Sequence, residues 1–431
     1  MARTIRIGLL GLGTVGGQVA RALTERREML GRISGAELVL QRACVRDLNR
    51  PRPVAAAQLT DDPAKIVAAD DIDLVVEVMG GQEPARTLIE TALAKGKSVV
   101  TANKRVVSWH GPGLLHLAAQ KNAELRYEAA VGGGIPLIAP LTDDLAANRI
   151  VELRAIINGT TNYILTKMAA GDSLEAALGE AQEKGYAEAD PRDDIDAVDA
   201  ADKLAILVRL AFGAVCTPAQ IFRQGLRGLE QRDLAYGREL GYVLKLVAIA
   251  RRGTRGIEAR VHPTFLPAGH PLARIDGAQN AVYVVGDLCG PVMFSGAGAG
   301  GEATASAVLS DLTQAARRIA LGDPAPQLRA SGGDAEGTAI TPIGEVRTRS
   351  YLRLAVDDVP GVFAQVTQVL ATHGIGLASV LQREPGHLGQ AEVVLLTYAA
   401  SESALSQAEQ DLARLPCVKA VKARIRVEDG R

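Results

Sequence analysis

The first third of the chain alternates between short apolar runs and longer runs in which apolar residues recur every three or four positions. The short runs have the length of buried strands, and the longer runs have the spacing of amphipathic helices. Strands that alternate with helices are typical of a parallel sheet covered by helices, so we predict an α/β domain over 1–134. Its predicted strands are 4–10, 37–45, 71–81, 97–104 and 124–134.

The pattern changes after this domain. The stretch 151–158 is strand-like, and NGTTNYILTKMAAG at 158–171 predicts a turn that leads into a helix. A further helix is predicted with Ser173 as its N-cap and Gly185 at the position just after its end.

Two later segments, 257–267 and 280–287, alternate apolar and polar residues. Such alternation predicts strands of a sheet that exposes one face to water, and we assign 135–302 to a second, α+β domain. The glycine-rich segment that follows predicts a turn and a helix, and we expect 303–320 to return and complete the first domain.

The last part of the chain has a different character. Residues 323–346 are rich in Pro, Gly, Ala and Thr without periodicity, which predicts a linker. Over 348–428 the pattern gives the order strand, helix, strand, strand, helix, strand. That order is the βαββαβ arrangement of a ferredoxin-like domain.

Composition limits the class of protein. The chain has 431 residues, a length that suggests two or three domains, and its net charge of −1 does not favour nucleic acid or an anionic membrane as a partner. It shows no apolar run of the ~18 residues that a membrane helix needs, and its N-terminus does not have the pattern of a signal peptide. Four cysteines without CxxC spacing indicate a reduced, cytoplasmic protein, and we interpret Cys44 and Cys289 as packing residues.

The first motif with chemical meaning is Gly11-Leu12-Gly13-Thr14-Val15-Gly16, which follows a predicted strand and opens a helix. In a dinucleotide site the first glycine allows the tight turn, the second lets the backbone approach a pyrophosphate, and the third lets the helix meet the strand. At the end of the second strand, Asp47 suits a ribose hydroxyl, whereas Arg46 suits the 2′-phosphate of NADP. Arg46 with Arg50 and Arg52 favours NADP, although NAD and solvated surface arginines stay possible.

The second motif is the acidic stretch 187–207. We predict a helix that is capped by Asp190 and continues to residue 213, with Asp199 and Lys203 four residues apart on one face. An exposed pair of this kind would be a plain surface contact, but the apolar second half of the helix indicates burial. With Glu188 on the preceding loop, the pair could grip an amino group and transfer a proton.

A lysine also ends the predicted strand TANK, at the sheet edge where ligands bind. That residue, Lys104, could approach the nicotinamide or the substrate, and a surface role is equally compatible with its position.

Together these residues resemble the homoserine dehydrogenase family. The resemblance covers nearly the whole chain and rests on four motifs in the same order, with Ala197 where the family usually has glycine and Ala297 where proline is common. The motifs are GYAEADPRDDIDAVDAADK (185–203), NGTTNYIL (158–165), HPLARIDGAQNAVYV (270–284) and GAGAG…TASAV (296–308).

The resemblance implies reversible NAD(P)-dependent interconversion of L-homoserine and L-aspartate 4-semialdehyde, in threonine, methionine and isoleucine biosynthesis. It implies that 135–302 is the catalytic and dimerisation domain of a monofunctional homodimer or homotetramer, with no fused aspartate kinase. By motif match, Lys203 would carry the proton and Lys104 would contact cofactor and substrate. The other implied roles are amino-acid binding for Glu188, Asp194 and Asp199, the nicotinamide pocket for Gly185 and Gly300, and a monovalent cation, expected to be sodium, for Glu128, Val131, Gly133 and Ile135.

The tail resembles an ACT domain, with the D-x-PG-x-F turn at Asp358–Phe363. ACT domains usually bind amino acids, so the resemblance implies inhibition by L-threonine near Gly361 and the turn 373–376. A tail that only dimerises is the alternative. Two other functions also stay open: a sensor of NADP and an amino acid, and a different dehydrogenase of an amino-acid semialdehyde.

Overall fold

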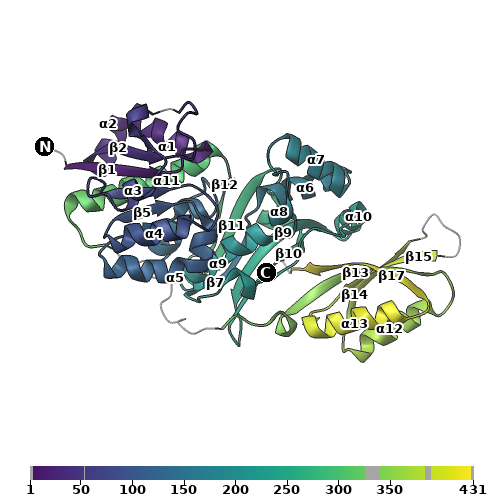
Figure 1. Ribbon diagram of the computed structural model, residues 1–431. Helices are drawn as coiled ribbons and strands as arrows, with labels where there is room; N and C mark the ends of the chain where they lie inside the picture. The colour runs from purple at the N-terminus through teal and green to yellow at the C-terminus, as the bar shows by residue number, and fades with distance from the viewer. Residues whose placement is uncertain (1–2, 53, 326–338, 384–389, 429–431) are drawn as a thin grey trace. The chain divides into compact units, whose positions relative to one another are not determined.

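A computed structural model describes residues 3–52, 54–325, 339–383 and 390–428 (Figure 1). The chain divides into two compact units, and both are built from separate stretches of sequence. The first consists of Met1–Val151, Asp202–Pro218 and Val284–Gly337, and the second of Glu152–Ala201, Ala219–Tyr283 and Thr338–Arg431. Our division into three domains remains an interpretation of this fold, and most of the predicted linker, 326–338, lies outside the described residues.

The first unit contains the predicted parallel sheet, in the order β3-β2-β1-β4-β5-β6. The first strand, β1, is buried along most of its length because it lies between β2 and β4 and is covered by helices on its faces. The strands are β1 (Arg3–Leu10), β2 (Ala36–Cys44), β3 (Leu59–Thr60), β4 (Leu74–Glu77), β5 (Ser98–Thr101) and β6 (Leu125–Arg126). The sequence therefore predicted each long strand, but β6 is much shorter than 124–134.

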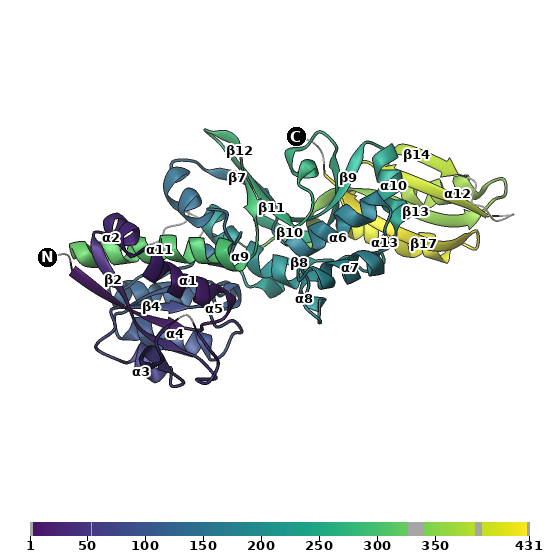
Figure 2. The same cartoon turned by 90° about the horizontal axis from the view of Figure 1, so that it is seen from above.

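Helices cover this sheet. The helix expected after the glycine-rich turn is two helices, because Arg26 interrupts it, and α11 (Gly301–Leu321) packs its Ala305, Val308 and Leu312 into the same core as Ile5 and Ile7. Residues 303–320 thus lie in a helix that packs within the first unit, and Figure 2 shows α11 beside α1 and α2. The other bounds are α1 (Thr14–Glu25), α2 (Arg27–Ser34), α3 (Ala64–Val67), α4 (Ala85–Ala94) and α5 (Lys104–Gln120).

The second unit has a mixed sheet in the order β11-β7-β9-β10-β17-β13-β15-β14. Its central pair, β9 (Tyr242–Arg252) and β10 (Ile257–Pro267), is antiparallel from Ile257↔Arg252 to Pro267↔Tyr242. The helices are α6 (Gly159–Ala170), α7 (Leu174–Glu183), α8 (Arg192–Ile195) and α10 (Gln231–Glu239). Among the described elements, β7 (Ile150–Ile156), α9 (Val198–Phe212), the 3₁₀ turn Pro218–Gln220 and β11 (Gln279–Gly286) cross the division between units. Ser173 caps α7 through Ala176 N and Gly185 follows its end with φ +73°, as predicted.

The prediction that one face of β10 is exposed to water was wrong. Arg260 and His262 lie on that strand and both are fully buried. Arg260 donates to Glu428 at 2.6 Å and to Glu258 at 2.8 Å, while His262 Nδ1 lies 2.8 Å from Thr264 Oγ1. The polar residues that produced the alternation therefore form a buried network, in which the charge is compensated by carboxylates instead of water.

The tail has the predicted βαββαβ order. Its sheet, β17-β13-β15-β14, continues from β10 because β17 pairs with it in parallel, at Thr264↔Arg426 and Phe265↔Val427. The elements are β13 (Arg347–Asp357), α12 (Val362–Thr372), β14 (Leu377–Arg383), β15 (Gln390–Thr397), β16 (Ala400–Ser401), α13 (Glu402–Arg414) and β17 (Val418–Val427). A sequence that predicted a separate domain gave no sign of this shared sheet.

Candidate active site

The glycine-rich turn has the geometry of a dinucleotide loop. Gly11 has φ +98°, a conformation that favours glycine, and a Cβ there would lie 2.9 Å from the Val78 carbonyl oxygen. A Cβ on Gly16 would lie 2.0 Å from the Gly11 oxygen, so the third glycine allows α1 to approach the turn. Around Gly13 a Cβ would meet no described atom within 4 Å, which leaves open space at the N-terminus of α1 where a pyrophosphate would bind.

Of the two glycines predicted for the nicotinamide pocket, Gly300 lies in the same unit as this turn. Gly300 is the N-cap of α11 with φ +125°, and a Cβ on its neighbour Gly301 would lie 2.8 Å from Thr14. Gly300 is therefore placed beside the glycine-rich turn. Gly185, predicted for the nicotinamide pocket, is exposed and belongs to the other unit.

The charged residues of the loop after β2 have different surroundings. Arg46 is exposed, and within the described ranges it has no hydrogen-bond or ion-pair partner. Asp47 Oδ1 accepts a hydrogen bond from Asn49 N at 2.9 Å, so this carboxylate stabilises its own turn. Arg52 Nη1 donates to the Leu12 carbonyl oxygen at 2.6 Å and thereby supports the glycine-rich turn.

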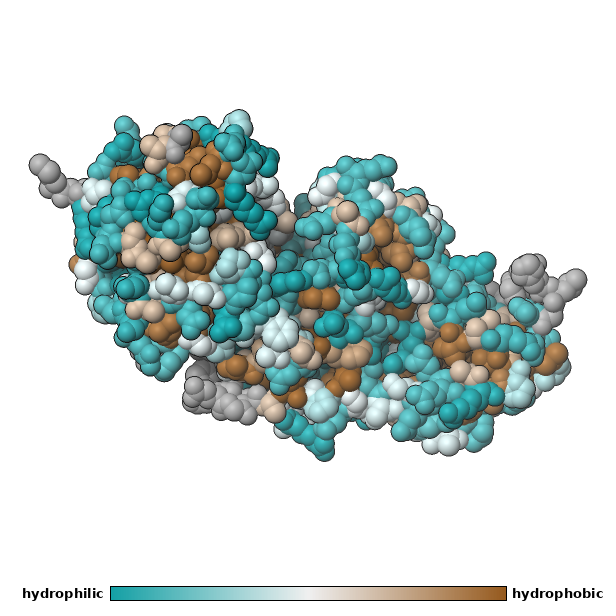
Figure 3. Space-filling view, in the orientation of Figure 1, coloured by the Kyte–Doolittle hydropathy of each residue, from teal (hydrophilic) through white to brown (hydrophobic). Residues whose placement is uncertain are grey.

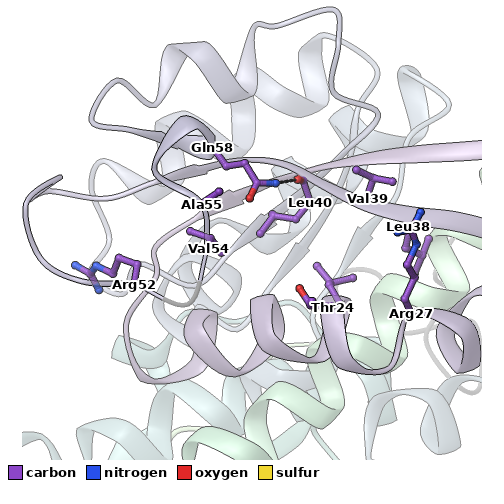
Figure 4. Close-up of a pocket in the computed structure, with 10 residues that line it drawn as sticks. Thr24, Arg27, Leu38, Val39, Leu40, Arg52, Val54, Ala55 and Gln58 are labelled. Carbon is purple, nitrogen blue, oxygen red and sulfur yellow. Dashed lines mark hydrogen bonds between the residues drawn. The ribbon is translucent and has the colours of Figure 1, made fainter.

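A hollow of about 610 Å³ lies next to this loop, beside β2 (Figure 4). The close-up shows Gln58 bonded to the Leu40 carbonyl, with Thr24 and Arg27 below it on the helical side. Its lining includes Arg52 but none of Gly11–Gly16, so this hollow is not the predicted dinucleotide site.

Lys104 is half-buried and is the first residue of α5, directly after the carboxyl end of β5. The preceding Asn103 caps the helix, because its side chain accepts a hydrogen bond from Val106 N at 3.2 Å. The carboxyl ends of parallel strands share one edge of the sheet, so the turn that carries Lys104 and the glycine-rich turn lie at the same edge.

The acidic stretch does not form the continuous helix that was predicted. It contains the short helix α8, a break at Asp196 and Ala197, and then α9. Ala197 has φ +59°, a left-handed conformation that costs a non-glycine residue roughly 1–2 kcal/mol. A glycine would adopt this conformation without that cost. Pro191, not Asp190, occupies the N-cap of α8.

The predicted substrate carboxylates meet at a residue that sequence reasoning did not select. Asn158 Nδ2 donates to Asp194 Oδ1 at 2.6 Å and to Asp199 Oδ2 at 2.9 Å. Asn158 and Asp199 are almost fully buried, and the Asn158 side-chain oxygen caps α6 by accepting from Thr161 N. An asparagine before a helix in NGTTNYIL was a capping signal, and nothing in the sequence showed its second role.

The remaining polar candidates are Lys203 on α9 and Glu188 on the loop before α8. Lys203 follows Asp199 by one helical turn and is 9% exposed, so burial of this helix is confirmed. Glu188 is exposed, and in the described part of the chain its carboxylate makes no hydrogen bond. The neighbouring carbonyl of Tyr186 accepts a hydrogen bond from Thr160 Oγ1 at 2.6 Å, which fixes the loop that carries Glu188 to α6.

The predicted cation segment begins with a short 3₁₀ turn at Glu128–Ala130. The Glu128 carboxylate accepts hydrogen bonds from the backbone N–H groups of Leu137, Ile138 and Ala139 at 2.6, 2.8 and 2.9 Å. Its backbone N–H donates to Asp311, and burial raises the pKa of Asp311 to about 7. The side chain of Glu128 is thus committed to the protein backbone.

The cysteines and the possible metal-binding side chains were also compared with the sequence predictions. Cys44, Cys216 and Cys417 are buried, but Cys289 is exposed in the turn before β12 (Gly290–Ala297), so its predicted packing role was wrong. Among the described residues there is no group of three or more His, Cys, Asp or Glu side chains that could hold a metal ion.

A parallel sheet with a glycine-rich dinucleotide turn is typical of nicotinamide-dependent oxidoreductases. A buried lysine one helical turn after a carboxylate is suited to an acid–base step. Family models match as homoserine dehydrogenase NAD-binding domain over 11–128, homoserine dehydrogenase over 136–313 and ACT domain over 350–417. The chain belongs to the homoserine dehydrogenase family, and it is an oxidoreductase that acts on a CH–OH group.

Individual relatives agree over their whole length. The homoserine dehydrogenase of Synechocystis is 41% identical, covering 98% of this chain and 99% of the relative, and that of Neisseria gonorrhoeae is 38% identical, covering 99% of both. The crystal structure of a homoserine dehydrogenase from Thiobacillus denitrificans is 42% identical with a TM-score of 0.94 and covers 100% of both chains. A hyperthermophilic archaeal homoserine dehydrogenase in complex with NADPH is 29% identical with a TM-score of 0.63, covering 76% of this chain and 100% of the other.

The surface carries both hydrophobic and hydrophilic residues. On the face drawn in Figure 3, hydrophobic residues are interspersed with hydrophilic ones. Over the described residues, the structure contains no helix that is both long and apolar enough to cross a membrane.

Proposed function

We propose that this chain catalyses reversible hydride transfer between L-homoserine and L-aspartate 4-semialdehyde, in threonine, methionine and isoleucine biosynthesis. The observation that carries the proposal is the hydrogen-bonded group of Asn158, Asp194 and Asp199, in which Asn158 and Asp199 are buried and Asp199 lies one helical turn before Lys203. Carboxylates that lie close together attract an ammonium group, and a lysine one helical turn further can serve the hydroxyl of the same short amino acid.

In the oxidation, the alcohol loses its hydroxyl proton while a hydride leaves its carbon. We assign the proton to Lys203, which would return it to the aldehyde oxygen in the reverse reaction. Lys104, on the turn beside the cofactor edge of the sheet, would contact cofactor and substrate. Bound nicotinamide supplies the hydride chemistry, and the protein orients the two reactants.

For the amino group of the substrate we assign Asp194, Asp199 and Glu188, and Asn158 would position the first two. Asn158→Ser keeps a side-chain oxygen to cap α6 but removes the amide that reaches both carboxylates. We expect the KM for L-homoserine to rise roughly tenfold, while the Kd for NADPH and the melting temperature change little. Steady-state kinetics gives the KM, nucleotide fluorescence gives the Kd, and thermal unfolding gives the melting temperature.

Asn158→Asp is the matched variant, since it also keeps the cap but adds a third carboxylate. We expect a larger rise in KM because like charges oppose one another. An unchanged KM in both variants would remove Asn158 from the substrate site.

For the cofactor we propose NADP in preference to NAD. Arg46 supports this choice because it is exposed and has no partner among the described residues, as does the hydrogen bond that Asp47 makes within its own turn. Arg46→Ala should raise the KM for NADP roughly tenfold and leave the KM for NAD nearly unchanged, because only NADP has the 2′-phosphate. Arg46→Lys, which keeps the charge, is the control, and an equal effect on both nucleotides would contradict the assignment.

For the monovalent cation we propose sodium, held by the backbone oxygens of Glu128, Val131, Gly133 and Ile135. The segment fits such an ion, since the carbonyls of Val131, Gly133 and Ile135 accept no hydrogen bond from any described residue although these residues are buried. An ion there would supply charge to satisfy these oxygens. Thermal unfolding in sodium chloride and in choline chloride tests this, and an equal melting temperature in both would count against the site.

We further propose that the ACT module binds L-threonine and lowers activity. Supporting features are the left-handed Gly361 at the start of α12 and the left-handed Gly374 in the turn after it. Threonine should inhibit homoserine oxidation in a saturable manner, with L-valine as the control. If threonine has no effect at any concentration, a role restricted to association is the better account of the tail.

The assembly is proposed to be a homodimer or homotetramer in the cytoplasm. Light scattering on the purified chain and cell fractionation test these two statements, and a monomer or a membrane-bound fraction would contradict them.

A further inference from the structure

One fully buried carboxyl group has no part in the reaction described above. Glu77 ends β4 and is 0% exposed. Its Oε2 accepts a hydrogen bond from Thr101 Oγ1 at 2.6 Å and its Oε1 accepts one from Met79 N at 2.7 Å. No lysine or arginine of the described chain pairs with it, and burial raises its pKa. A buried acid without a counter-charge is costly, and these two hydrogen bonds, with further ones from the Asn103 side chain and the Gly80 backbone, offset part of that cost.

The first contact leads to Lys104. Thr101 Oγ1, which donates to Glu77, also accepts a hydrogen bond from Asn103 N at 3.0 Å. Asn103 then caps α5 through Val106 N and donates from Nδ2 to the Gly81 carbonyl at 2.7 Å. The Thr101 hydroxyl therefore stabilises the turn from Thr101 to Lys104, and its hydrogen bond to Glu77 fixes the orientation of that hydroxyl.

The second contact leads to the cofactor turn. Met79 N belongs to the loop after β4, and this loop lies directly behind Gly11, where a Cβ would be 2.9 Å from Val78 O and 3.2 Å from Met79 Cα. Val78 N also donates to Leu10 O at 2.9 Å. The Glu77 carboxyl group thus links two segments by hydrogen bonds: the loop after β4, which packs against Gly11, and the turn that carries Lys104.

We propose that Glu77 is a positioning residue, which acts through the Thr101 hydroxyl to hold Lys104 in register with the nicotinamide site. The inference rests on the role proposed for Lys104 in homoserine oxidation. It predicts a loss in the chemical step, because a misplaced lysine weakens interactions made in the transition state more than it weakens binding.

Thr101 offers a closely matched pair of variants for the test. Thr101→Val keeps the shape and removes the hydroxyl, whereas Thr101→Ser keeps the hydroxyl and loses only a methyl group. We expect Thr101→Val to lower kcat roughly tenfold, with less than about a threefold change in the KM for L-homoserine and in the Kd for NADPH. Thr101→Ser should retain a kcat close to that of the unmodified chain.

Glu77→Gln keeps the size of the side chain but offers one accepting oxygen instead of two. It should also lower kcat, and the double variant Glu77→Gln with Thr101→Val should be no slower than Thr101→Val alone, because both changes break one contact. The single variant Glu77→Gln keeps the proposal testable if Thr101→Val does not fold.

Three results would overturn the proposal: a normal kcat in Thr101→Val and Glu77→Gln, an equal loss in Thr101→Val and Thr101→Ser, or multiplicative losses in the double variant. The unmodified chain separates this failure from that of the proposed function. If it does not oxidise homoserine at all, the function is wrong, whereas an active chain with unaffected variants refutes only the role of Glu77.

Discussion

Replacement of Lys203 by methionine is expected to lower kcat for homoserine oxidation by roughly 10³-fold, within the range for loss of an acid–base group. The side chain is 9% exposed, so methionine, with a similar length and no charge, suits the same space. The fold should be retained, and the Kd for NADPH should change by less than about threefold, because Lys203 is assigned to the proton and not to the nucleotide. Stopped-flow and steady-state rates give kcat, and nucleotide fluorescence gives the Kd.

Two further variants define what Lys203 contributes. Lys203→Arg keeps the positive charge but cannot release a proton near neutral pH, so it should be nearly as slow as Lys203→Met. Lys104→Met should lose activity to a smaller extent if Lys104 contacts the reactants without carrying the proton. Near-normal turnover in Lys203→Met, or full activity in Lys203→Arg, would refute the assignment.

The second large effect is expected at the dinucleotide turn, where three glycines call for three different results. Gly16→Ala places a Cβ at 2.0 Å from the Gly11 oxygen, so the turn must shift and we expect the melting temperature and NADPH affinity both to fall. Gly13→Ala meets open space, so the unliganded protein should melt normally, but the Kd for NADPH should rise about tenfold or more because the methyl group occupies the space of the pyrophosphate.

Gly17→Ala is the control within the same helix. It also meets no described atom within 4 Å, and alanine favours a helix over glycine by up to about 1 kcal/mol, so stability should be equal or slightly higher. Calorimetry and nucleotide titration of all three variants complete the test. A Gly13→Ala variant that binds NADPH normally would show that the turn does not hold the cofactor in the expected way.

The sequence predicted the elements that local chemistry determines. The apolar runs of β1 and β2, the turn at Gly11–Gly16, the caps at Ser173 and Gly185, and the strand order of the tail all follow from periodicity and turn residues. The candidate residues Asp199 and Lys203 were recognised because a four-residue spacing on an apolar helix is visible in one dimension.

The failures occur where distant residues decide the environment. The polar residues of β10 suggested a face exposed to water. In the structure Arg260 is buried, and its charge is compensated by an ion pair with Glu428, which lies far along the chain. The sequence did not predict the break at Ala197, because a left-handed conformation is expected at glycine but not at alanine. The role of Asn158 depends on Asp194 and Asp199, which are more than thirty positions away in the sequence.

The most direct test of the account is the absorbance of reduced nicotinamide when the purified chain is mixed with L-homoserine and NADP, with NAD and the Lys203→Met variant in parallel. The account predicts that NADPH forms from L-homoserine and NADP, that NADH forms more slowly when NAD is the acceptor, and that Lys203→Met forms NADPH roughly 10³-fold more slowly than the unmodified chain. If a folded chain that binds NADPH reduces neither nucleotide with L-homoserine, and does not oxidise NADPH with L-aspartate 4-semialdehyde, the central claim is contradicted.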